Sequence, residues 1–424
     1  MVPPFLGSNP RAPANNMLSN IDKISSNKII KDIFNILNDG EEETACLLVG
    51  GCIRNLVIEK EIDDYDIVTI LLPEKIKEKL NKINLSFDDT FEKYGSIKIL
   101  TKECSIEINT LRKDYNQDGR HTDVMFTNDW KQDALRRDFS MNAIYSDLEG
   151  RVYDPFNGID DLKNGKIVFI GDPLKKIEED GLRVLRYFRF FAQFSKHEHE
   201  EYVLNAITKN IEKIKLLSSE RLIGELKKIL LSGEAYKIFD NDFSKNFYLS
   251  VYKGIKYLNR LEFKKRKRIL RKDIDWVILL SLLLIDQTKN FERFVKDFNI
   301  SNEIKNRLGS LQKQFTFKTS DTVDKIEVLL KRSASIGPSA VRDFIDFQYL
   351  VNEKYSYDIY LENIAILNKT TPPKFEFDTQ ILISKGFKEN KSLGDAISFL
   401  KHRWLSNNYK ILDKDIEDAV KLFK

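Results

Sequence analysis

Residues 45–69 of the chain read ACLLVGGCIRNLVIEKEIDDYDIVT, and this stretch decides the fold of the region around it. Its apolar run at 45–49 predicts a strand that ends at Gly50 and Gly51, where a helix is expected to begin. Two glycines after a strand let backbone N–H groups approach a bound anion, and Arg54 in the first helical turn adds a positive charge. The stretch therefore predicts a turn that faces phosphate, although a Gly-Gly pair also occurs in simple tight turns.

The same stretch carries two aspartates, Asp64 and Asp66, at the start of a second predicted strand. Residues two apart in a strand point to the same face, so these carboxylates should lie together. Neighbouring carboxylates repel unless cations share them, and oxygen ligands of this kind suit Mg²⁺. Two such ions can activate an attacking hydroxyl and stabilise a leaving pyrophosphate. Glu107, on the polar face of a strand predicted at 105–111, is a candidate third carboxylate; the alternative for the aspartates is an acidic surface turn.

Two basic segments follow, RRDFSMNA at 136–143 and EDGLRVLRYFRF at 179–190. The charged residues of the second segment recur every three positions and should line one side of a helix: Asp180, Arg183, Arg186 and Arg189. Apolar neighbours would leave the last two arginines partly desolvated, which is costly without an anionic partner. The alternative is a helix face held by internal salt bridges.

The pattern along the chain changes near residue 173. Before it, further strands are predicted at 67–70, at 97–100 and, as a strand–turn–strand unit, at 142–153, with a helix at 24–37. After it, helical periodicity continues almost to the end, with breaks at Pro338 and at Pro372-Pro373. The sequence therefore predicts a mixed α and β region followed by an all-α region.

Composition excludes several classes of protein. The chain has 424 residues with 69 Lys and Arg against 65 Asp and Glu, and its longest nearly uncharged apolar run, 276–285, is about half of the ~20 residues that a membrane-spanning helix needs. We therefore expect a soluble protein. Three cysteines and four histidines support neither a disulfide framework nor a zinc site. A reducing compartment such as the cytoplasm is the simplest expectation, because the first 16 residues lack a signal-peptide core.

The charge is unevenly distributed. Residues 1–150 carry 19 basic and 26 acidic residues, and residues 151–424 carry 50 and 39. The acidic part suggests metal ligands, and the basic part suggests a polyanionic partner. The densest basic run lies at 253–272, and an alternative interpretation of it is a helix face exposed to solvent. The centre of this run contains the candidate RNA-binding residues Lys264, Lys265, Arg266, Lys267 and Arg268.

In this order and at these intervals, the four motifs resemble the bacterial class II tRNA nucleotidyltransferase and poly(A) polymerase family, and most of all its CCA-adding enzymes. The resemblance runs from about residue 47 to 233, and it includes LSSER at 217–221. It implies an α+β fold with a polymerase-β-like nucleotidyltransferase head, a mixed sheet with helices, followed by an all-α neck, body and tail. The implied boundaries are an N-terminal extension at 1–22, the head at 23–165, the neck at 166–235, the body at 236–340 and the tail at 341–424.

The resemblance also implies the reaction and the roles of the residues. The reaction is template-independent addition of CMP and AMP, from CTP and ATP, to the 3′ end of tRNA, with release of pyrophosphate. Asp64 and Asp66 would be catalytic and bind Mg²⁺, with Glu107 beside them. The nucleotide would be held by residues of all four motifs: Gly50, Gly51, Arg54, Arg137, Asp138, Asn142, Asp180, Arg183, Arg186 and Arg189. A flexible loop with Asp118, Gly119 and Arg120 would help the site change from C to A.

The role in base recognition agrees with the chemistry of the bases. Cytosine and adenine both present an amine donor beside a ring-nitrogen acceptor, whereas uracil and guanine present the reverse. An acceptor on Asp180 next to a donor on Arg183 would accept C and A and reject U and G. An unmatched partner in a dry pocket costs about 1 to 3 kcal/mol, which is enough for selection.

Two departures from the family pattern bear on these expectations. Asn55 stands where the family usually has Asp, so a charged role there is replaced by hydrogen bonding or capping. No His-Asp doublet occurs, so we expect no attached phosphohydrolase domain. Three alternatives remain: a poly(A) polymerase, a partial enzyme that adds only CC or only A, and a non-catalytic RNA-binding protein that kept the fold. The pair Asp64 and Asp66 argues against the last; the oligomeric state is left open, and no obligatory protein partner is expected.

Overall fold

The computed structural model describes residues 18–115, 123–262, 274–286, 288, 290–317, 326–369 and 371–424. The chain forms two compact units, Met1–Glu225 and Leu226–Lys424. Three predicted features lie wholly or mostly outside the described residues: the N-terminal extension, the loop at 118–120 and the basic run at 264–268. The finer division into head, neck, body and tail stays a prediction.

The first unit is built on a mixed sheet of seven strands in the order β3-β4-β5-β2-β1-β8-β9. Only the contact between β2 and β5 is parallel; the other neighbours are antiparallel. A separate hairpin is formed by β6 and β7. The strands are β1 (Cys46–Val49), β2 (Asp64–Thr69), β3 (Phe87–Asp88), β4 (Ser96–Ile99), β5 (Ser105–Thr110), β6 (Arg112–Tyr115), β7 (Asp123–Phe126), β8 (Tyr145–Ser146) and β9 (Val152–Tyr153).

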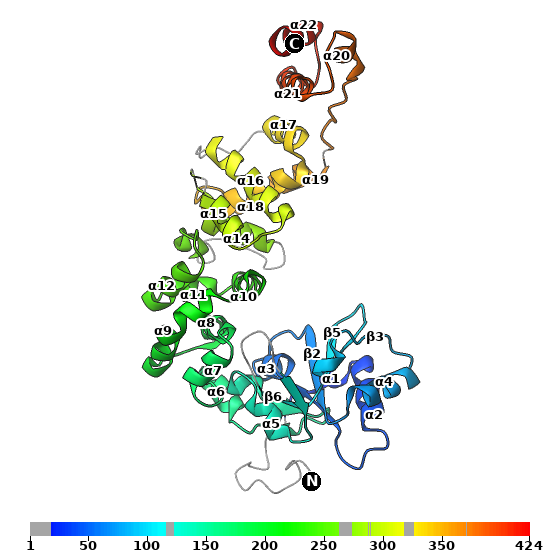
Figure 1. Ribbon diagram of the computed structural model, residues 1–424, viewed down its shortest axis with the longest axis vertical. Coiled ribbons are helices and arrows are strands. Elements are labelled where there is room, and N and C mark those ends of the chain that lie inside the picture. Colours follow the sequence, from blue (N-terminus) through cyan, green and yellow to red (C-terminus); the bar gives the residue numbers. More distant parts are fainter. Residues whose placement is uncertain are drawn as a thin grey trace. The chain divides into compact units, whose positions relative to one another are not determined.

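One face of the sheet is covered by helices from the start of the chain, which lie beside it in Figure 1. They are α1 (Asp22–Ser25), α2 (Lys28–Asn38), α3 (Gly51–Val57) and α4 (Pro73–Lys82). The predicted single helix at 24–37 is divided because the Asn27 side chain accepts hydrogen bonds from the backbone of Ile29 and Ile30, and so caps α2. The core on this face contains Ile33, Leu48, Ile67, Ile106 and Ile108.

The opposite face is only partly covered, and this leaves room for the site. Its smaller core includes Val49 and Val68 of the sheet and Trp130 of α5 (Trp130–Leu135). Asp64 and Asp66 alternate with the buried residues Tyr65 and Ile67, so they lie on the same face as Val68 but nearer the start of β2. The unit also contains the 3₁₀ segments η1 (Glu92–Tyr94) and η2 (Ser140–Asn142) and helix α6 (Gly158–Asn164).

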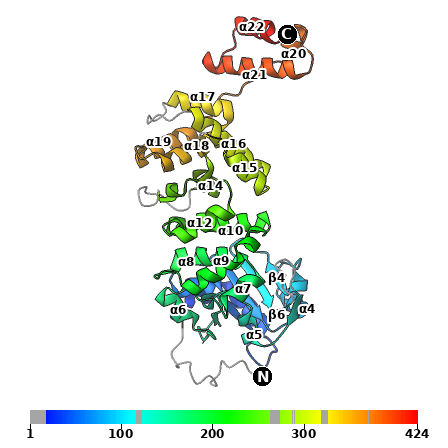
Figure 2. The same ribbon diagram turned by 60° about the vertical axis from the view of Figure 1, so that its left-hand side comes forward.

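Four helices follow α6 in the sequence. They are α7 (Pro173–Glu179), α8 (Leu182–Phe194), α9 (Glu201–Lys215) and α10 (Ser219–Ser232), whose sequence runs across the boundary between the two units. Figure 2 shows α7, α8 and α9 packed against one another. Helix α8 buries Val184, Leu185 and Phe188 on one side, and its arginines therefore lie on the other side.

The described residues of the second unit form helices joined by loops, and none of them forms a strand. Its elements are α11 (Ala235–Phe239), α12 (Asp242–Val251), η3 (Leu258–Glu262), α14 (Trp276–Leu284), α15 (Asn290–Asp297), α16 (Asn302–Phe317), α17 (Ile326–Ile336), α18 (Pro338–Val351), α19 (Tyr357–Lys369), α20 (Gln380–Ser384), α21 (Lys391–Ser406) and α22 (Asp413–Phe423). Helix α14 is buried almost all round and forms a core helix. In the described part of the chain, every helix is too short or too polar to cross a lipid bilayer.

The architecture confirms the predicted α+β class, with a mixed sheet first and helices afterwards. The strands expected at 45–49, 67–70, 97–100 and 105–111 are β1, β2, β4 and β5, and the strand–turn–strand unit is the short hairpin of β8 and β9. The prediction of strand at 142–144 was wrong in part, because Asn142 ends the 3₁₀ segment η2. Three further strands were not predicted from local sequence: β3, which pairs with β4 at the edge of the sheet, and β6 and β7, which pair with each other in the separate hairpin.

Candidate active site

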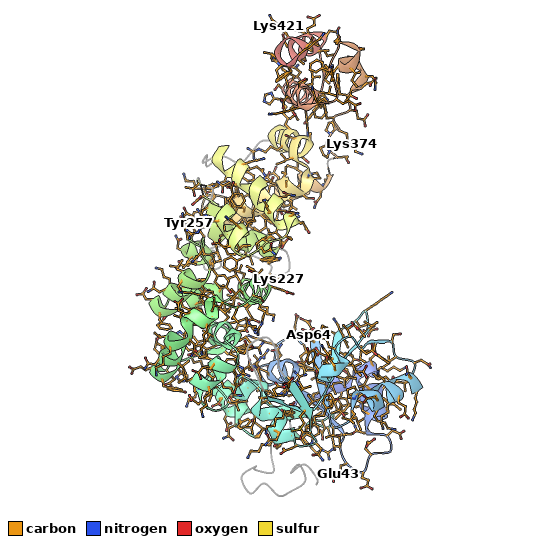
Figure 3. The ribbon with its side chains drawn as sticks, viewed as in Figure 1. Glu43, Asp64, Lys227, Tyr257, Lys374 and Lys421 are labelled. Carbon is orange, nitrogen blue, oxygen red and sulfur yellow. The ribbon has the colours of Figure 1, made fainter. Side chains whose placement is uncertain are left out.

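Strand pairing brings the glycine turn and the carboxylates together. Antiparallel pairing places Val49, the last residue before Gly50, opposite Asp66. Parallel pairing places Asp66 opposite Glu107 on the next strand. Because paired residues point to the same side of a sheet, Asp64, Asp66 and Glu107 share one face beside the start of α3. Figure 3 labels Asp64 at the edge of the first unit where β2 begins.

The absence of a side chain at Gly50 keeps this corner open. Gly50 has φ +75°, which favours glycine, and a Cβ there would lie 3.4 Å from Asp66 Oδ2 and 3.8 Å from Arg137 Nη1. The turn thus lies between a carboxylate and a guanidinium of opposite charge. Helix α3 starts at Gly51, so its free N–H groups face the same corner.

The surroundings of Asp66 disfavour its charged form. Burial raises the pKa of Asp66, and the nearby charges of Glu107 and Asp64 raise it further, while Arg137 acts in the opposite direction. Glu107 accepts a hydrogen bond from Ser96 Oγ at 2.5 Å, which fixes its orientation. A bound cation would relieve the repulsion among the three groups.

The donor set fits a divalent cation that is completed by substrate. Among the described residues, His, Cys, Asp and Glu side chains form no cluster of three or more with the geometry of a metal site. Two carboxylates plus phosphate oxygens are the usual surroundings of Mg²⁺, which is seldom bound by an all-protein cage. Asp64 and Asp66 are therefore the residues that could hold such an ion, with the remaining ligands from a triphosphate and water.

A chain of hydrogen bonds links the glycine turn to helix α8. Arg54 Nη1 donates to Asn142 Oδ1 at 2.6 Å, and Asn142 Nδ2 donates to Asp138 Oδ1 at 2.9 Å. The other oxygen of Asp138 accepts from Arg186 Nε at 2.5 Å. Burial acts to raise the pKa of Asp138, but Arg186 and Asn142 outweigh it and hold the pKa below its usual value. Asp138 is thus buried and fully engaged, and it connects two arginines rather than lying open to a ligand.

Three guanidinium groups surround one aromatic ring. The centroid of the buried Phe190 ring lies 5.0 Å from the guanidinium carbon of Arg54, 5.4 Å from that of Arg186 and 4.1 Å from that of Arg189. Arg189 also forms an ion pair of 2.9 Å with Glu225 of α10, which is 2% exposed. The ring face attracts these cations and offsets part of their mutual repulsion.

Arg54 has the least compensated positive charge of this group. Burial, together with Arg189 and Arg186, lowers its pKa to about 10. Among the described residues, it forms no ion pair with a carboxylate, and its buried Nε has no hydrogen-bond partner. Its Nη2 donates to Asn55 Oδ1 at 3.3 Å, and Asn55 Nδ2 donates to Glu61 O. A buried guanidinium with an unused donor is suited to an anionic ligand.

Arg137 is held from behind by a buried carboxylate. Asp133, which is 0% exposed, accepts from Arg137 Nη2 at 3.1 Å, from Tyr145 OH at 2.9 Å and from Arg136 Nε at 2.8 Å. The two arginines outweigh the effect of burial and lower the pKa of Asp133 to about 2. Arg136 also lies 4.0 Å from Asp114 of β6, at the base of the hairpin.

The structure does not bring the side chains of Asp180 and Arg183 together. Asp180 lies before α8, not within it, and its carboxylate accepts from the backbone of Leu182 and from Arg221. Arg183, 7% exposed, donates to Glu179 and to the backbone oxygens of Lys176 and Arg136. The two side chains are therefore positioned separately, each by its own partners, and their role in base recognition stays a prediction.

Four contributors to the site were not assigned a role from the sequence: Asp133, Phe190, Arg221 and Glu225. Glu225 carried the clearest signal, because it is an acidic residue within the apolar stripe of Leu222 and Leu226. Asp133, in a short helix that buries Trp130 and Ala134, carried a weaker one. Nothing in the local sequence identifies the partners of these residues, since those lie on other elements.

Comparisons with known proteins agree with this arrangement. Residues 46–168 match the family described as the poly A polymerase head domain, and residues 199–241 match the probable RNA and SrmB-binding site of polymerase A. The chain is 30% identical to CCA tRNA nucleotidyltransferase 1, mitochondrial, of Danio rerio over 86% of this chain and 84% of that protein. It is 29% identical to the CCA-adding enzyme of Lactobacillus helveticus over 87% and 92%.

Solved structures of CCA-adding enzymes share this fold. The Bacillus stearothermophilus CCA-adding enzyme in complex with CTP superposes with a TM-score of 0.70 at 20% identity, covering 92% of this chain and 95% of that chain. The Thermotoga maritima CCA-adding enzyme complexed with tRNA superposes with a TM-score of 0.53 at 19% identity, covering 96% and 99%.

Proposed function

Because the chain belongs to the family of CCA-adding tRNA nucleotidyltransferases, we propose that it adds CMP and AMP, from CTP and ATP, to the 3′ end of tRNA. The corner at Gly50 is the observation that carries this proposal. There, a carboxylate of the sheet and a guanidinium of the next motif lie within 4 Å of the position that a side chain would occupy. Divalent metal dependence follows from the family, and we propose Mg²⁺ as the ion.

Asp64 and Asp66 would hold the metal. When bound there, the ion would lower the pKa of the attacking 3′ hydroxyl and neutralise charge on the triphosphate. Glu107 would add negative charge beside the two aspartates, and this charge would favour binding of a cation. These assignments rest on the shared face of the three carboxylates and on the raised pKa of Asp66.

The arginines would bind and orient the triphosphate. Arg54 has a buried Nε without a partner, and the N-terminus of α3 adds backbone donors. Arg137 enters the same corner with its guanidinium fixed by Asp133. Arg186 and Arg189 add positive charge from α8, and Asp138 and Asn142 set the spacing between Arg54 and Arg186. Donors fixed before substrate arrives lower the cost of binding the charged reacting groups.

Base selection would use Asp180 and Arg183 at the start of α8. Asp180 supplies only acceptors and Arg183 supplies only donors, which suits the Watson–Crick edges of cytosine and adenine. Outside the described residues, the loop at 118–120 and the basic run at 264–268 keep their proposed roles in the change from C to A and in contacts with tRNA phosphates. The three cysteines are free thiols, which suits a reducing compartment such as the cytoplasm.

The proposal is tested with tRNA transcripts that end before, within and after CCA. Each is incubated with CTP, ATP or both, and product lengths are read at nucleotide resolution. We expect completion to CCA and no extension of the finished end. A ladder of A residues would replace the proposal by poly(A) polymerase activity, and a stop after CC would replace it by partial addition. The absence of any product would favour an RNA-binding protein.

A further inference from the structure

Four of the five arginines assigned to the nucleotide site have a carboxylate partner within the protein. Each of the four forms an ion pair at 2.5 to 3.1 Å: Arg137 with Asp133, Arg183 with Glu179, Arg186 with Asp138 and Arg189 with Glu225. Arg54 is the exception, because among the described residues it pairs with no carboxylate and its Nε has no hydrogen-bond partner. A partly buried cation without a counter-charge is suited to an anion from outside the protein.

The side chains that hold the Arg54 guanidinium are both amides. Asn55 Oδ1 accepts from Nη2 at 3.3 Å, a distance at which a carboxylate would form an ion pair, and Asn142 Oδ1 accepts from Nη1 at 2.6 Å. These contacts fix the direction of the guanidinium and leave its charge uncompensated. Burial lowers the pKa of Arg54 to about 10, with further lowering by Arg189 and Arg186, so the group is still a cation at neutral pH.

The surroundings of Asn55 require an amide rather than a carboxylate. Asn55 Nδ2 donates to the backbone oxygen of Glu61 at 3.0 Å, and the backbone oxygen of Asn55 accepts from the N–H of Lys60 at 2.8 Å. These bonds tie α3 to the segment that leads to β2. A carboxylate at this position has no proton for Glu61 and would place one oxygen against another. An aspartate of the same shape could therefore make the contact with Arg54 but not the contact with Glu61.

The contact with Asn55 holds Arg54 Nη2 beside the glycine turn. The backbone N–H of Arg54 donates to Gly50 O at 2.9 Å, so the residue lies within one helical turn of the two glycines. A Cβ at Gly51 would lie 3.8 Å from Arg54 Nη2. The nitrogen that Asn55 fixes therefore lies at the same turn that a carboxylate and a second guanidinium approach at Gly50.

We propose that Asn55 is a positioning residue for the triphosphate, because its neutral amide holds the Arg54 guanidinium at the glycine turn without neutralising it. The nucleotide itself then supplies the counter-charge. This role rests on the proposed function, in which Arg54 binds the triphosphate, and it adds that the residue at position 55 sets the affinity for the nucleotide. A carboxylate at position 55 would form an ion pair with Nη2 and compete with phosphate for Arg54.

The test compares Asn55→Asp, Asn55→Ala and the double variant Arg54→Gln/Asn55→Asp with the unmodified enzyme and with Arg54→Gln alone. Calorimetry gives Kd for CTP, ATP and inorganic triphosphate, each with Mg²⁺, at low and at high salt. Kinetics with tRNA transcripts gives KM and kcat. Asn35→Asp is the matched control, since it adds the same charge at an exposed position of α2, on the opposite face of the sheet. Thermal unfolding is measured for every protein.

We expect Asn55→Asp to raise Kd about tenfold for all three ligands and to weaken its salt dependence, because an internal anion already neutralises Arg54. KM should rise in parallel while kcat stays near its original value, a division that partial unfolding does not produce. Asn55→Ala should raise Kd only about threefold and keep the salt dependence, because Arg54 is less well fixed but still uncompensated. Asn55→Asp should add little to Arg54→Gln, through which it acts. Asn35→Asp should change neither Kd nor its salt dependence.

Other outcomes separate the role of Asn55 from the proposed function. If Asn55→Asp binds all three ligands as tightly as the unmodified enzyme, the role is wrong and the proposed function stands. If Asn55→Asp and Asn55→Ala weaken binding equally, with unchanged salt dependence, neutrality at position 55 has no effect and the role is again wrong. If Asn55→Asp does not fold, an unchanged Kd in Asn55→Ala would overturn the positioning of Arg54. If the unmodified enzyme binds inorganic triphosphate but adds no C or A to the transcripts, the proposed function itself fails.

Discussion

The two oppositely charged sides of the site are held in place in different ways. On the carboxylate side, strand alternation and strand pairing set Asp64, Asp66 and Glu107, and among the described residues none of the three forms an ion pair. On the arginine side, Arg186 and Arg189 each have a carboxylate partner from another element. The negative charge of the carboxylate side is therefore available to an external cation. On the arginine side, most of the positive charge is already neutralised by carboxylates of the protein before any ligand binds.

Arg54 is the exception that connects the two sides. It belongs to the glycine turn next to Asp66, yet its guanidinium lies with those of α8 over Phe190. Its hydrogen-bond partners are the neutral Asn142 and Asn55. This difference between the two sides predicts that substitutions of the carboxylates abolish nucleotide addition and that substitution of Arg54 weakens nucleotide binding. Substitutions of the acidic residues that hold the other arginines should have smaller effects.

Removal of a carboxylate should have the largest effect. We expect Asp64→Ala or Asp66→Ala to lower the rate of nucleotide addition by at least about 10³-fold, because the metal loses a ligand and several kcal/mol of barrier lowering are lost. Binding of tRNA should be unchanged in a filter-binding assay. The exposed neighbour Asp63, changed to Asn, is the control. Near-normal rates in both alanine variants would remove the metal assignment.

Arg54→Gln should have the next largest effect. Loss of an uncompensated guanidinium should raise KM for CTP and ATP about thirtyfold and equally, since charge-assisted hydrogen bonds contribute about 1.5–3 kcal/mol. Steady-state kinetics with both nucleotides measure this effect. Arg151→Gln, which breaks the ion pair with Asp147 beside the hairpin of β8 and β9, serves as the control. Unchanged KM values would show that Arg54 is a structural cation.

Asp133→Asn tests the support behind Arg137 through stability and pH. The pKa of Asp133 is lowered to about 2 in the folded protein, so its charge stabilises the fold above the unfolded pKa of about 4, and this contribution is lost as the pH falls toward 2. At pH 7 the variant should be less stable by about 2 kcal/mol in urea unfolding. The difference should narrow as the pH is lowered below 4. A constant difference across that range would contradict the assignment.

Glu225→Gln should have the smallest effect. An amide oxygen can still accept from Arg189, so only the charge is lost, and KM for both nucleotides should rise about threefold with kcat nearly unchanged. Glu220→Gln, an exposed change on the same helix, controls for effects on α10. An effect as large as that of Arg54→Gln would mean that the arginine side depends on its internal partners as strongly as on the ligand.

The sequence predicted the carboxylate side better than the arginine side. Alternation of Ile106 and Ile108 with Glu107 placed that residue on the correct face, and the parallel register then set it opposite Asp66. The spacing of Arg183, Arg186 and Arg189 correctly predicted a helix. It also suggested that Asp180 continues the same row, whereas Asp180 precedes the helix, accepts a hydrogen bond from the backbone of Leu182 and contacts Arg221, 41 positions later in the chain.

The sequence by itself determined the local order: an apolar strand that ends in two glycines, aspartates at alternate positions, and arginines at helical spacing. These depend on backbone periods of two and of about 3.6 residues, which neighbours in the chain fix. The tertiary structure alone decided which charges meet, as in the contacts of Asp133 with Tyr145, of Glu225 with Arg189 and of Arg221 with Asp180. Such partners are selected by burial, because a charge taken out of water requires an opposite charge or a hydrogen bond from wherever the fold can supply one.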